Sequence, residues 1–211
     1  MHLGTDRWEL ARTPGLVFWR LLGTGAGSNT TVGTADLRRR AVFAVWRNPA
    51  DLDHFLTRST LARQWTSTGE HFCVRLRGLS GSGHWNGFAV LGHVAQGVTH
   101  PAAPVAVLTR ATVAIRHWRA FARAGRPVAN ELANADGLLG VVGVGEAPVL
   151  RQATFSLWAN AASINRFAYD QPHHRKVIEH TRRDKWYGEE LFIRFEPYAW
   201  SGTWDGADPL S

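Results

Sequence analysis

The chain contains an internal repeat, and the repeat limits the folds that it can adopt. The sequence FAVWRNPADLDHF (43–55) aligns without gaps on FSLWANAASINRF (155–167). Three more pairs keep the same order: LLGTG with VVGVG (21–25, 141–145), GEHFCVRL with GEELFIRF (69–76, 188–195), and SGHWNG with SGTWDG (82–87, 201–206). Motifs repeated in one order indicate two copies of one structural unit. We expect a single domain over residues 1–211, made of two related halves at about 14–104 and 105–211.

Each copy predicts a strand, a helix and a returning strand. The runs AVFAVW and ATFSLW are rich in β-branched and aromatic residues, which favours strands. Asn48 and Asn160 follow these runs in the position of a helix N-cap. We expect helices from there to about Arg63 and about Lys185, and returning strands at HFCVRL and LFIRF.

The segment between the copies adds a third unit of the same kind. VAVLTRATV (105–113) predicts a strand, AIRHWRAFARA (114–124) a helix, and GLLGVVGVG (137–145) another apolar strand. Strand-helix-strand units in this succession are the ferredoxin-like split βαβ pattern. The expected fold class is therefore α+β, with two ferredoxin-like halves duplicated within one chain and packed into a barrel with the helices outside.

Composition excludes several classes of protein. A hydrophobic fraction of 45% in 211 residues provides for a real core. No apolar run reaches the roughly 18 residues that span a bilayer, and the N-terminus lacks the apolar core of a signal peptide. The single cysteine, Cys73, excludes an internal disulfide. We expect a cytoplasmic protein.

The net charge of +7 comes almost entirely from arginines. These arginines are scattered, whereas nucleic-acid binders cluster their basic residues, so we expect no nucleic-acid partner. Some arginines could instead meet the carboxylates of a cofactor or an anionic membrane surface, which leaves a peripheral membrane contact open.

Several motifs taken together resemble one known family. They are FWRLLGTG, AVLTRATV, VGVGEAPVLRQATFSLW, FAYDQPHH and RRDKWYGEELFIRF with GTWDG, and they extend over about residues 14–210. This pattern is similar to the spheroidene monooxygenase family of carotenoid ketolases. The resemblance implies a dimeric-α/β-barrel type of fold, completed here within one chain, and a haem b cofactor. It further implies an oxidoreductase of carotenoid biosynthesis: a haem-dependent monooxygenase that oxidises the end of an acyclic carotenoid with O₂ or a peroxide. A ferredoxin-type protein would donate the electrons.

A haem iron needs an axial ligand, and the segment after Pro172 offers three histidines. His174 is in phase with the apolar side of the predicted helix, so we expect it to face the sheet as the ligand. His173 is one residue out of phase, but the Pro172–His173 pair also matches the family motif and makes His173 the second candidate. His180 is expected on the surface. It lies seven residues from His173, about 10 Å along a helix axis, too far for both to bind one zinc ion.

Three other side chains are candidates for the site. Arg110 interrupts an apolar strand and needs a partner, which could be a haem propionate, a distal oxygen or an ordinary ion pair. His117 could ligate or hydrogen-bond from the other sheet, or serve only the structure. Cys73 could be a thiolate ligand, but its counterpart in the second copy is Phe192, which favours packing.

Four aromatic residues of the second copy could wall a flat macrocycle or form ordinary core: Phe155, Trp158, Phe167 and Trp186. The counterparts in the first copy would pack without any cofactor.

Three other functions remain open at this point. One is a related haem enzyme with a different substrate or reaction, such as dehydration or N-oxidation. The second is a cofactor-free barrel that binds a small molecule. The third and weakest is a basic structural protein that meets lipid or nucleic acid. A duplicated barrel needs no partner to close, and a homo-oligomer stays open as well.

Overall fold

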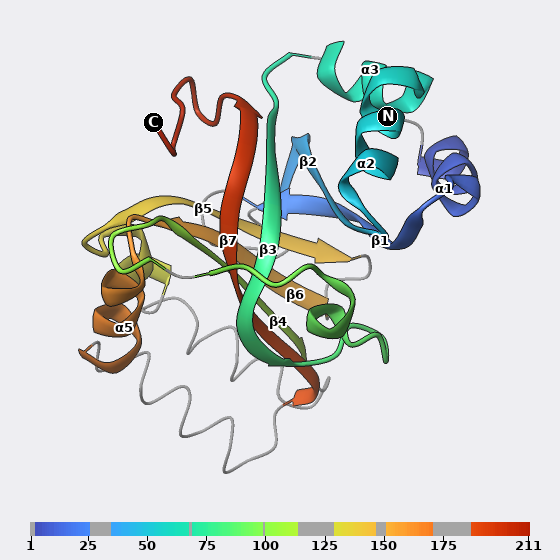
Figure 1. Ribbon diagram of the computed structural model, residues 1–211. Coiled ribbons are helices and arrows are strands. Elements are labelled where there is room, and N and C mark those ends of the chain that lie inside the picture. Colours follow the sequence, from blue (N-terminus) through green and yellow to red (C-terminus); the bar gives the residue numbers. More distant parts are fainter. Residues whose placement is uncertain are drawn as a thin grey trace.

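The structure is a computed structural model that describes residues 3–25, 35–67, 69–98, 100–113, 129–146, 151–170 and 187–211 (Figure 1). Its elements follow in chain order: α1 (Leu3–Arg12), β1 (Leu16–Gly25), β2 (Ala35–Trp46), α2 (Pro49–Arg58), α3 (Thr60–Ser67), β3 (Phe72–Gly83), the 3₁₀ turn η2 (Val90–His93), β4 (Val105–Val113), β5 (Leu138–Glu146), β6 (Arg151–Trp158), α5 (Ala161–Asp170) and β7 (Tyr187–Gly202).

The strands form one antiparallel sheet of seven strands in the order β2-β1-β5-β6-β4-β7-β3. In the second half of the chain, β6 lies between β4 and β5, and β4 lies between β6 and β7. Strands that follow one another through a crossover are thus separated by one strand, which is the split βαβ arrangement. The expected α+β class is confirmed.

The sheet curls so that all seven strands contribute to one core. Side chains alternate between the two faces of a strand, and every second residue points inward. Phe43 on the edge strand β2 and Phe195 on β7 illustrate the curl, because their ring centroids are 6.4 Å apart although several strands separate them in the sheet.

The helices cover the outer face of the sheet in two places. Figure 1 shows α1, α2 and α3 gathered at one side and α5 at the other. Under α2 and α3, Phe55 and Leu61 are buried with Leu10 of α1. Under α5, Ile164 and Trp158 are buried in a separate cluster.

The sequence repeat appears in the structure as equivalent local contacts. The side-chain oxygen of Asn48 accepts a hydrogen bond from the backbone N–H of Asp51 at 2.9 Å, and that of Asn160 accepts one from Ser163 at 3.0 Å. Both asparagines therefore cap the helices that follow them. The outer-face ring pairs also match: Trp46 and Phe55 are 5.2 Å apart at 42°, and their counterparts Trp158 and Phe167 are 5.5 Å apart at 41°.

One predicted helix is interrupted. The helix expected from Asn48 to about Arg63 is two helices, α2 and α3, separated at Ser59, which has an extended backbone. The Ser59 hydroxyl oxygen accepts from the N–H groups of Leu61 and Ala62 at 3.0 and 3.2 Å, and the hydroxyl donates to Glu9 at 2.7 Å. Ser59 caps the second helix and ties it to α1, so a new helix starts where a continuous one was expected. In the other copy α5 ends at Asp170, and the rest of the helix expected up to about Lys185 lies outside the described residues.

Candidate functional site

Arg110 lies inside the curled sheet, on the same face of β4 as Ala106 and Leu108, and is only 2% exposed. Its Nη1 donates to the Glu189 carboxylate at 2.7 Å, and its Nη2 donates to the Asn86 side chain at 3.2 Å. The guanidinium also lies 5.3 Å from the centre of the Trp85 ring. Of the partners that the sequence left open for Arg110, the structure shows an ion pair within the protein.

Glu189 joins this arginine to a backbone turn. Its carboxylate oxygens accept hydrogen bonds from the N–H groups of Asn86 and Gly87, both at 2.9 Å. Asn86 and Gly87 have φ values of 50° and 76°, and consecutive N–H groups in such a turn form a concave site for an anion. Burial raises the pKa of Glu189, but the backbone hydrogen bonds and Arg110 outweigh it, so the pKa lies below its ordinary value.

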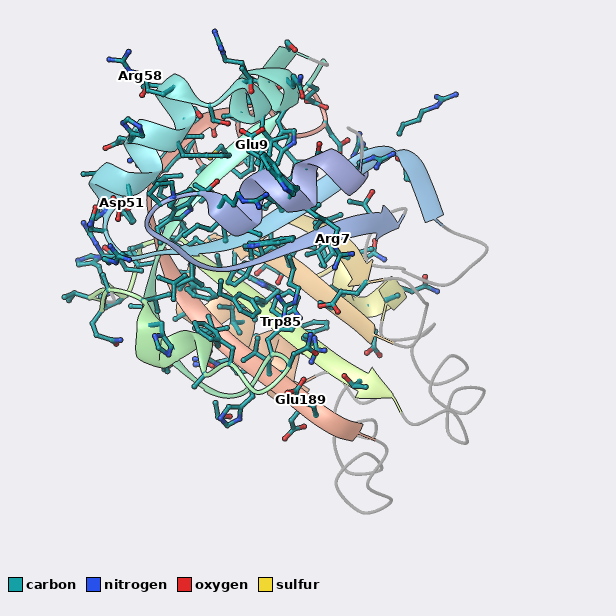
Figure 2. The ribbon with its side chains drawn as sticks, turned by 90° about the vertical axis from the view of Figure 1, so that its right-hand side faces the viewer. Arg7, Glu9, Asp51, Arg58, Trp85 and Glu189 are labelled. Carbon is teal, nitrogen blue, oxygen red and sulfur yellow. The ribbon has the colours of Figure 1, made fainter. Side chains whose placement is uncertain are left out.

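Trp85 connects this ion pair to a second one. It is 1% exposed, and its indole N–H donates to Glu146. Glu146 in turn lies 3.4 Å from the Nε of Arg20, whose guanidinium stacks at 4.1 Å on the Phe18 ring. We call Arg110, Glu189, Arg20 and Glu146, with Trp85 between them, the charged cluster; Figure 2 labels Trp85 and Glu189.

Beside the charged cluster, the interior is aromatic. Phe43 stacks on Trp85 with centroids 5.3 Å apart, and Phe18 stacks on Phe88 at 4.5 Å. These rings pack against one another in the core, so the surroundings of the charged cluster are apolar. In the charged cluster each carboxylate faces an arginine, so the cluster holds Trp85 in place and contains no unpaired carboxylate that could act as a base.

The predicted aromatic set does not lie in one place. Phe155 points into the sheet interior and stacks on Trp204, 6.4 Å away, whereas Trp158 and Phe167 pack on the outer face under α5. Phe155 and Trp158 are three residues apart on one strand, and the alternation of strand side chains sends them to opposite faces. Trp186, the fourth member, lies outside the described residues.

The candidate iron ligands His173 and His174 also lie outside the described residues, as do His180 and His117. The histidines that the structure does describe are all exposed: His54, His71, His84, His93 and His100. In this part of the chain no three of the residues His, Cys, Asp and Glu form a metal-binding group. Arg110 is already paired with Glu189. The structure therefore does not test the predicted haem site, because its candidate ligands lie outside the described residues.

Cys73 is partly buried in β3, and burial raises the pKa of its thiol. A raised pKa keeps the thiol protonated near neutral pH, which suits a packing residue rather than a thiolate ligand.

A surface groove of about 310 Å³ lies between α1 and α2. Its lining is mixed, with the aromatic ring of Trp8, the carboxylates of Glu9 and Asp51, and the guanidinium of Arg58 (Figure 2). Arg12 stacks on Trp8 at 4.0 Å. Sequence reasoning missed this groove because it did not predict α1, whose residues show no strong apolar periodicity.

Two curated relatives cover nearly the whole chain. A protein of Rhodobacter capsulatus named spheroidene monooxygenase is 30% identical over 207 residues, which are 98% of this chain and 86% of that protein. A protein of the same name from Rubrivivax gelatinosus is 33% identical over 197 residues, 92% of this chain and 73% of that protein.

This chain belongs to the spheroidene monooxygenase family. The family expected from the motifs is thereby confirmed, and membership places the chain among the oxidoreductases of the monooxygenase type. No protein-family model matches the chain. A solved structure of a candidate monooxygenase from Fusobacterium nucleatum covers 99% of this chain and 93% of its own, with 10% identity and a TM-score of 0.46. A match at that TM-score does not assign the fold, which is assigned from the strand order of this chain. No helix in the part of the chain that the structure describes is long and apolar enough to cross a membrane.

Proposed function

We propose that this chain is a monooxygenase that oxidises a lipophilic substrate, an acyclic carotenoid of the spheroidene type. The observation that carries the proposal is the identity of 30–33% with proteins named spheroidene monooxygenase over more than nine-tenths of the chain. The aromatic interior supports it, because stacked rings offer dispersion contacts to a conjugated, apolar chain.

The proposal includes haem b as the cofactor, with His174 as the axial ligand of the iron and His173 as the second candidate. Haem supplies the redox chemistry that activates O₂ or a peroxide, and a ferredoxin-type protein would supply electrons. We propose a cytoplasmic protein that meets the membrane surface at its periphery, where a carotenoid resides. The support for haem is the resemblance to the family, since the candidate ligands His173 and His174 lie outside the described residues.

The chain's own described residues would act by position and by exclusion of water. The charged cluster holds Trp85 from two sides, through Arg110 over its ring and Glu146 at its N–H. Trp85 in turn stacks on Phe43 and fixes the aromatic wall. A rigid apolar wall keeps water from a reactive oxidant and orients one end of a long substrate.

Oxygen labelling tests the function. Incubation of the purified protein with an acyclic carotenoid, an electron donor and isotopically labelled O₂ should give a product that carries one labelled oxygen atom, as mass spectrometry detects. A product without label, or no product with or without added haemin, would count against a monooxygenase.

The visible spectrum tests the cofactor separately. Added haemin should give a Soret band that shifts on reduction and with carbon monoxide, and His174→Ala should weaken or shift that band. His173→Ala distinguishes the second candidate, and His180→Ala is the matched control that should leave the band unchanged.

A cofactor-free oxygenase or binding protein of the same fold is the second candidate. In that case the protein remains colourless with haemin while it still binds or oxidises the substrate.

A further inference from the structure

The helix α1 presents a basic and aromatic face to the solvent. Successive residues of a helix are about 100° apart, so Arg7, Trp8, Ala11 and Arg12 fall within an arc of about 140°. All four are exposed, whereas Leu10 on the other side of the helix is buried. Among the described side chains of α1, this arc contains two arginines and no carboxylate. We call it the basic face of α1.

Contacts with α2 and α3 hold α1 with this face outward. Leu10 is 2% exposed and packs in one cluster with Phe55 of α2 and Leu61 of α3. The Glu9 carboxylate accepts a hydrogen bond from the Ser59 hydroxyl at 2.7 Å. The packing of α1 therefore fixes the direction of the basic face, and in Figure 2 α1 lies in front of the sheet.

Trp8 is the most exposed aromatic residue in the described part of the chain. It is 64% exposed, against 40% for Trp200 and 39% for Phe192. The Arg12 guanidinium lies 4.0 Å from the centre of the Trp8 ring. A single exposed apolar residue is ordinary on a protein surface. An exposed indole among arginines, however, has the composition of a membrane-interface anchor, in which the ring enters the headgroup layer and the cations meet phosphates.

The arginines on this side of the molecule are not committed to ion pairs within the part of the chain that the structure describes. None of the ion pairs found there includes Arg7, Arg12 or Arg58. The exposed carboxylate of Asp53 on α2 pairs with Arg75 at 2.6 Å instead. The positive charge of these three arginines can therefore meet a negatively charged surface.

The groove between α1 and α2 brings cations of the two helices together. Arg12 and Arg58 both line the groove, and both are exposed. The two carboxylates of the groove lie deeper, because Glu9 and Asp51 are half-buried and Oδ2 of Asp51 is enclosed beside Gly15. A phosphate that approaches from outside thus meets the guanidinium groups first, and their paired N–H donors match phosphate oxygens.

We infer that the basic face of α1 and the groove beside it dock the protein on an anionic phospholipid surface. Trp8 enters the headgroup layer, and Arg7, Arg12 and Arg58 bind lipid phosphates. The inference deepens the proposed function and rests on it for its purpose, because an acyclic carotenoid is an apolar molecule that resides in a bilayer. A nucleic-acid duplex offers the same phosphates but no apolar layer for the indole, so the exposure of Trp8 favours the membrane.

Sedimentation with lipid vesicles tests the inference on the full chain, without carotenoid. The chain should bind vesicles in which about a third of the phosphatidylcholine is replaced by phosphatidylglycerol, and it should bind pure phosphatidylcholine at least about tenfold more weakly. A rise in salt from about 0.1 M to about 1 M should release the chain, because it shortens the Debye length from about 10 Å to about 3 Å.

Single substitutions locate the contact. Arg7→Gln, Arg12→Gln and Arg58→Gln should each weaken binding to the anionic vesicles about fivefold, the effect of about 1 kcal/mol per basic residue near such a surface. Arg166→Gln is the matched control, since it removes one exposed arginine from α5 at the other side of the sheet (Figure 1). The control should change binding less than about twofold.

The indole has its own pair of variants. Trp8→Ala should weaken vesicle binding about tenfold, and Trp8→Phe, which keeps an aromatic ring, should weaken it less. Every side chain substituted in these tests is exposed, so the variants should keep the fold, as circular dichroism checks.

Three results would overturn the inference. Equal binding to neutral and anionic vesicles, or binding to neither, excludes an anionic lipid surface as the partner. Equal losses in Arg58→Gln and Arg166→Gln show that the vesicles respond to net charge and not to this face. Binding to a DNA duplex that is tighter than binding to vesicles, and that falls in the same variants, assigns the face to nucleic acid.

The inference and the proposed function fail separately. Oxidation of a carotenoid dispersed in detergent needs no bilayer, so Arg58→Gln should oxidise it at the rate of the parent chain. Vesicle binding without oxidation contradicts the proposed function alone. Oxidation in detergent without vesicle binding contradicts the inference alone.

Discussion

Arg77 and Glu196 occupy equivalent places in the two halves of the chain, and they pair with each other in the β3–β7 ladder, with Nη1 and Oε2 3.6 Å apart. The pairs on either side are symmetric about them: Phe72 with Gly202 at one end and Leu191 with Gly83 at the other. An approximate twofold axis therefore passes between Arg77 and Glu196.

The same axis passes through a second place in the sheet. Thr24 and Val144, which are equivalent in the repeat, pair where β1 meets β5. Each place joins one half of the chain to the other, as isologous contacts join the subunits of a symmetric dimer. The repeat is thus assembled like a homodimer whose two subunits lie in one chain.

The helix caps of the two halves should contribute similar amounts to the free energy of unfolding. Asn48→Ala and Asn160→Ala should each lower the free energy of unfolding by about 1 kcal/mol, because each leaves a backbone N–H at a helix start without its acceptor. Urea unfolding measures the change. Asn160→Asp keeps the acceptor and should recover most of the loss, and a loss as large as that of Asn160→Ala would contradict the capping role.

The Arg110–Glu189 ion pair should contribute more to the stability of the fold than an exposed ion pair. Arg110→Met should lower the free energy of unfolding by about 3 kcal/mol, because it leaves the Glu189 carboxylate without its partner. This value is at the low end for a broken buried ion pair, since the Glu189 side chain is 26% exposed. The double variant Arg110→Met/Glu189→Gln should cost less than the sum of the single changes, since it leaves no unpaired charge. The control is Arg166→Met at the exposed pair with Asp136, where we expect about 1 kcal/mol or less. Additive costs at Arg110 and Glu189 would show that the two are not coupled.

The stability of the fold should fall in acid partly through Glu189. Its pKa in the folded protein lies below the ordinary value of 4.5, chiefly because backbone N–H groups and Arg110 favour the charged form over the cost of burial. The folded state therefore binds fewer protons than the unfolded chain, and the contribution is complete above pH 4.5 and lost as the pH falls through the lower folded pKa.

Denaturation of the parent chain and of Glu189→Gln over a pH series measures this contribution. The difference in unfolding free energy should narrow as the pH drops below about 4.5. Glu190→Gln changes the same charge at an exposed neighbour and controls for net charge. A difference that stays constant with pH would contradict the linkage.

Cys73 should react slowly with thiol reagents in the folded protein. Burial raises its pKa, so little thiolate is present near neutral pH, and the side chain is partly covered. Alkylation at pH 7 should be at least about tenfold slower than in the urea-unfolded chain. Equal rates in the two states would show that the thiol is accessible and activated.

Several features could be predicted from the sequence because they depend on neighbours in the chain. The repeat, the strands that flank each helix and the capping asparagines Asn48 and Asn160 all follow from local pattern and spacing. The break at Ser59 was missed, since it depends on a contact with Glu9, fifty residues away. The separation of Phe155 from Trp158 was missed as well, although strand alternation alone would have predicted it.

The sequence by itself determined the strands that flank the repeated helices, the capping asparagines and the duplication, because periodicity, caps and repeated motifs can be recognised within short stretches of the chain. Only the tertiary structure decided which residues meet. It gave Arg110 a carboxylate 79 residues away, placed Trp85 between two ion pairs, and left β2 and β3 as the edges of the sheet. The physical reason is that strand pairing and charge neutralisation join distant segments, and their geometry exists only after the sheet has curled.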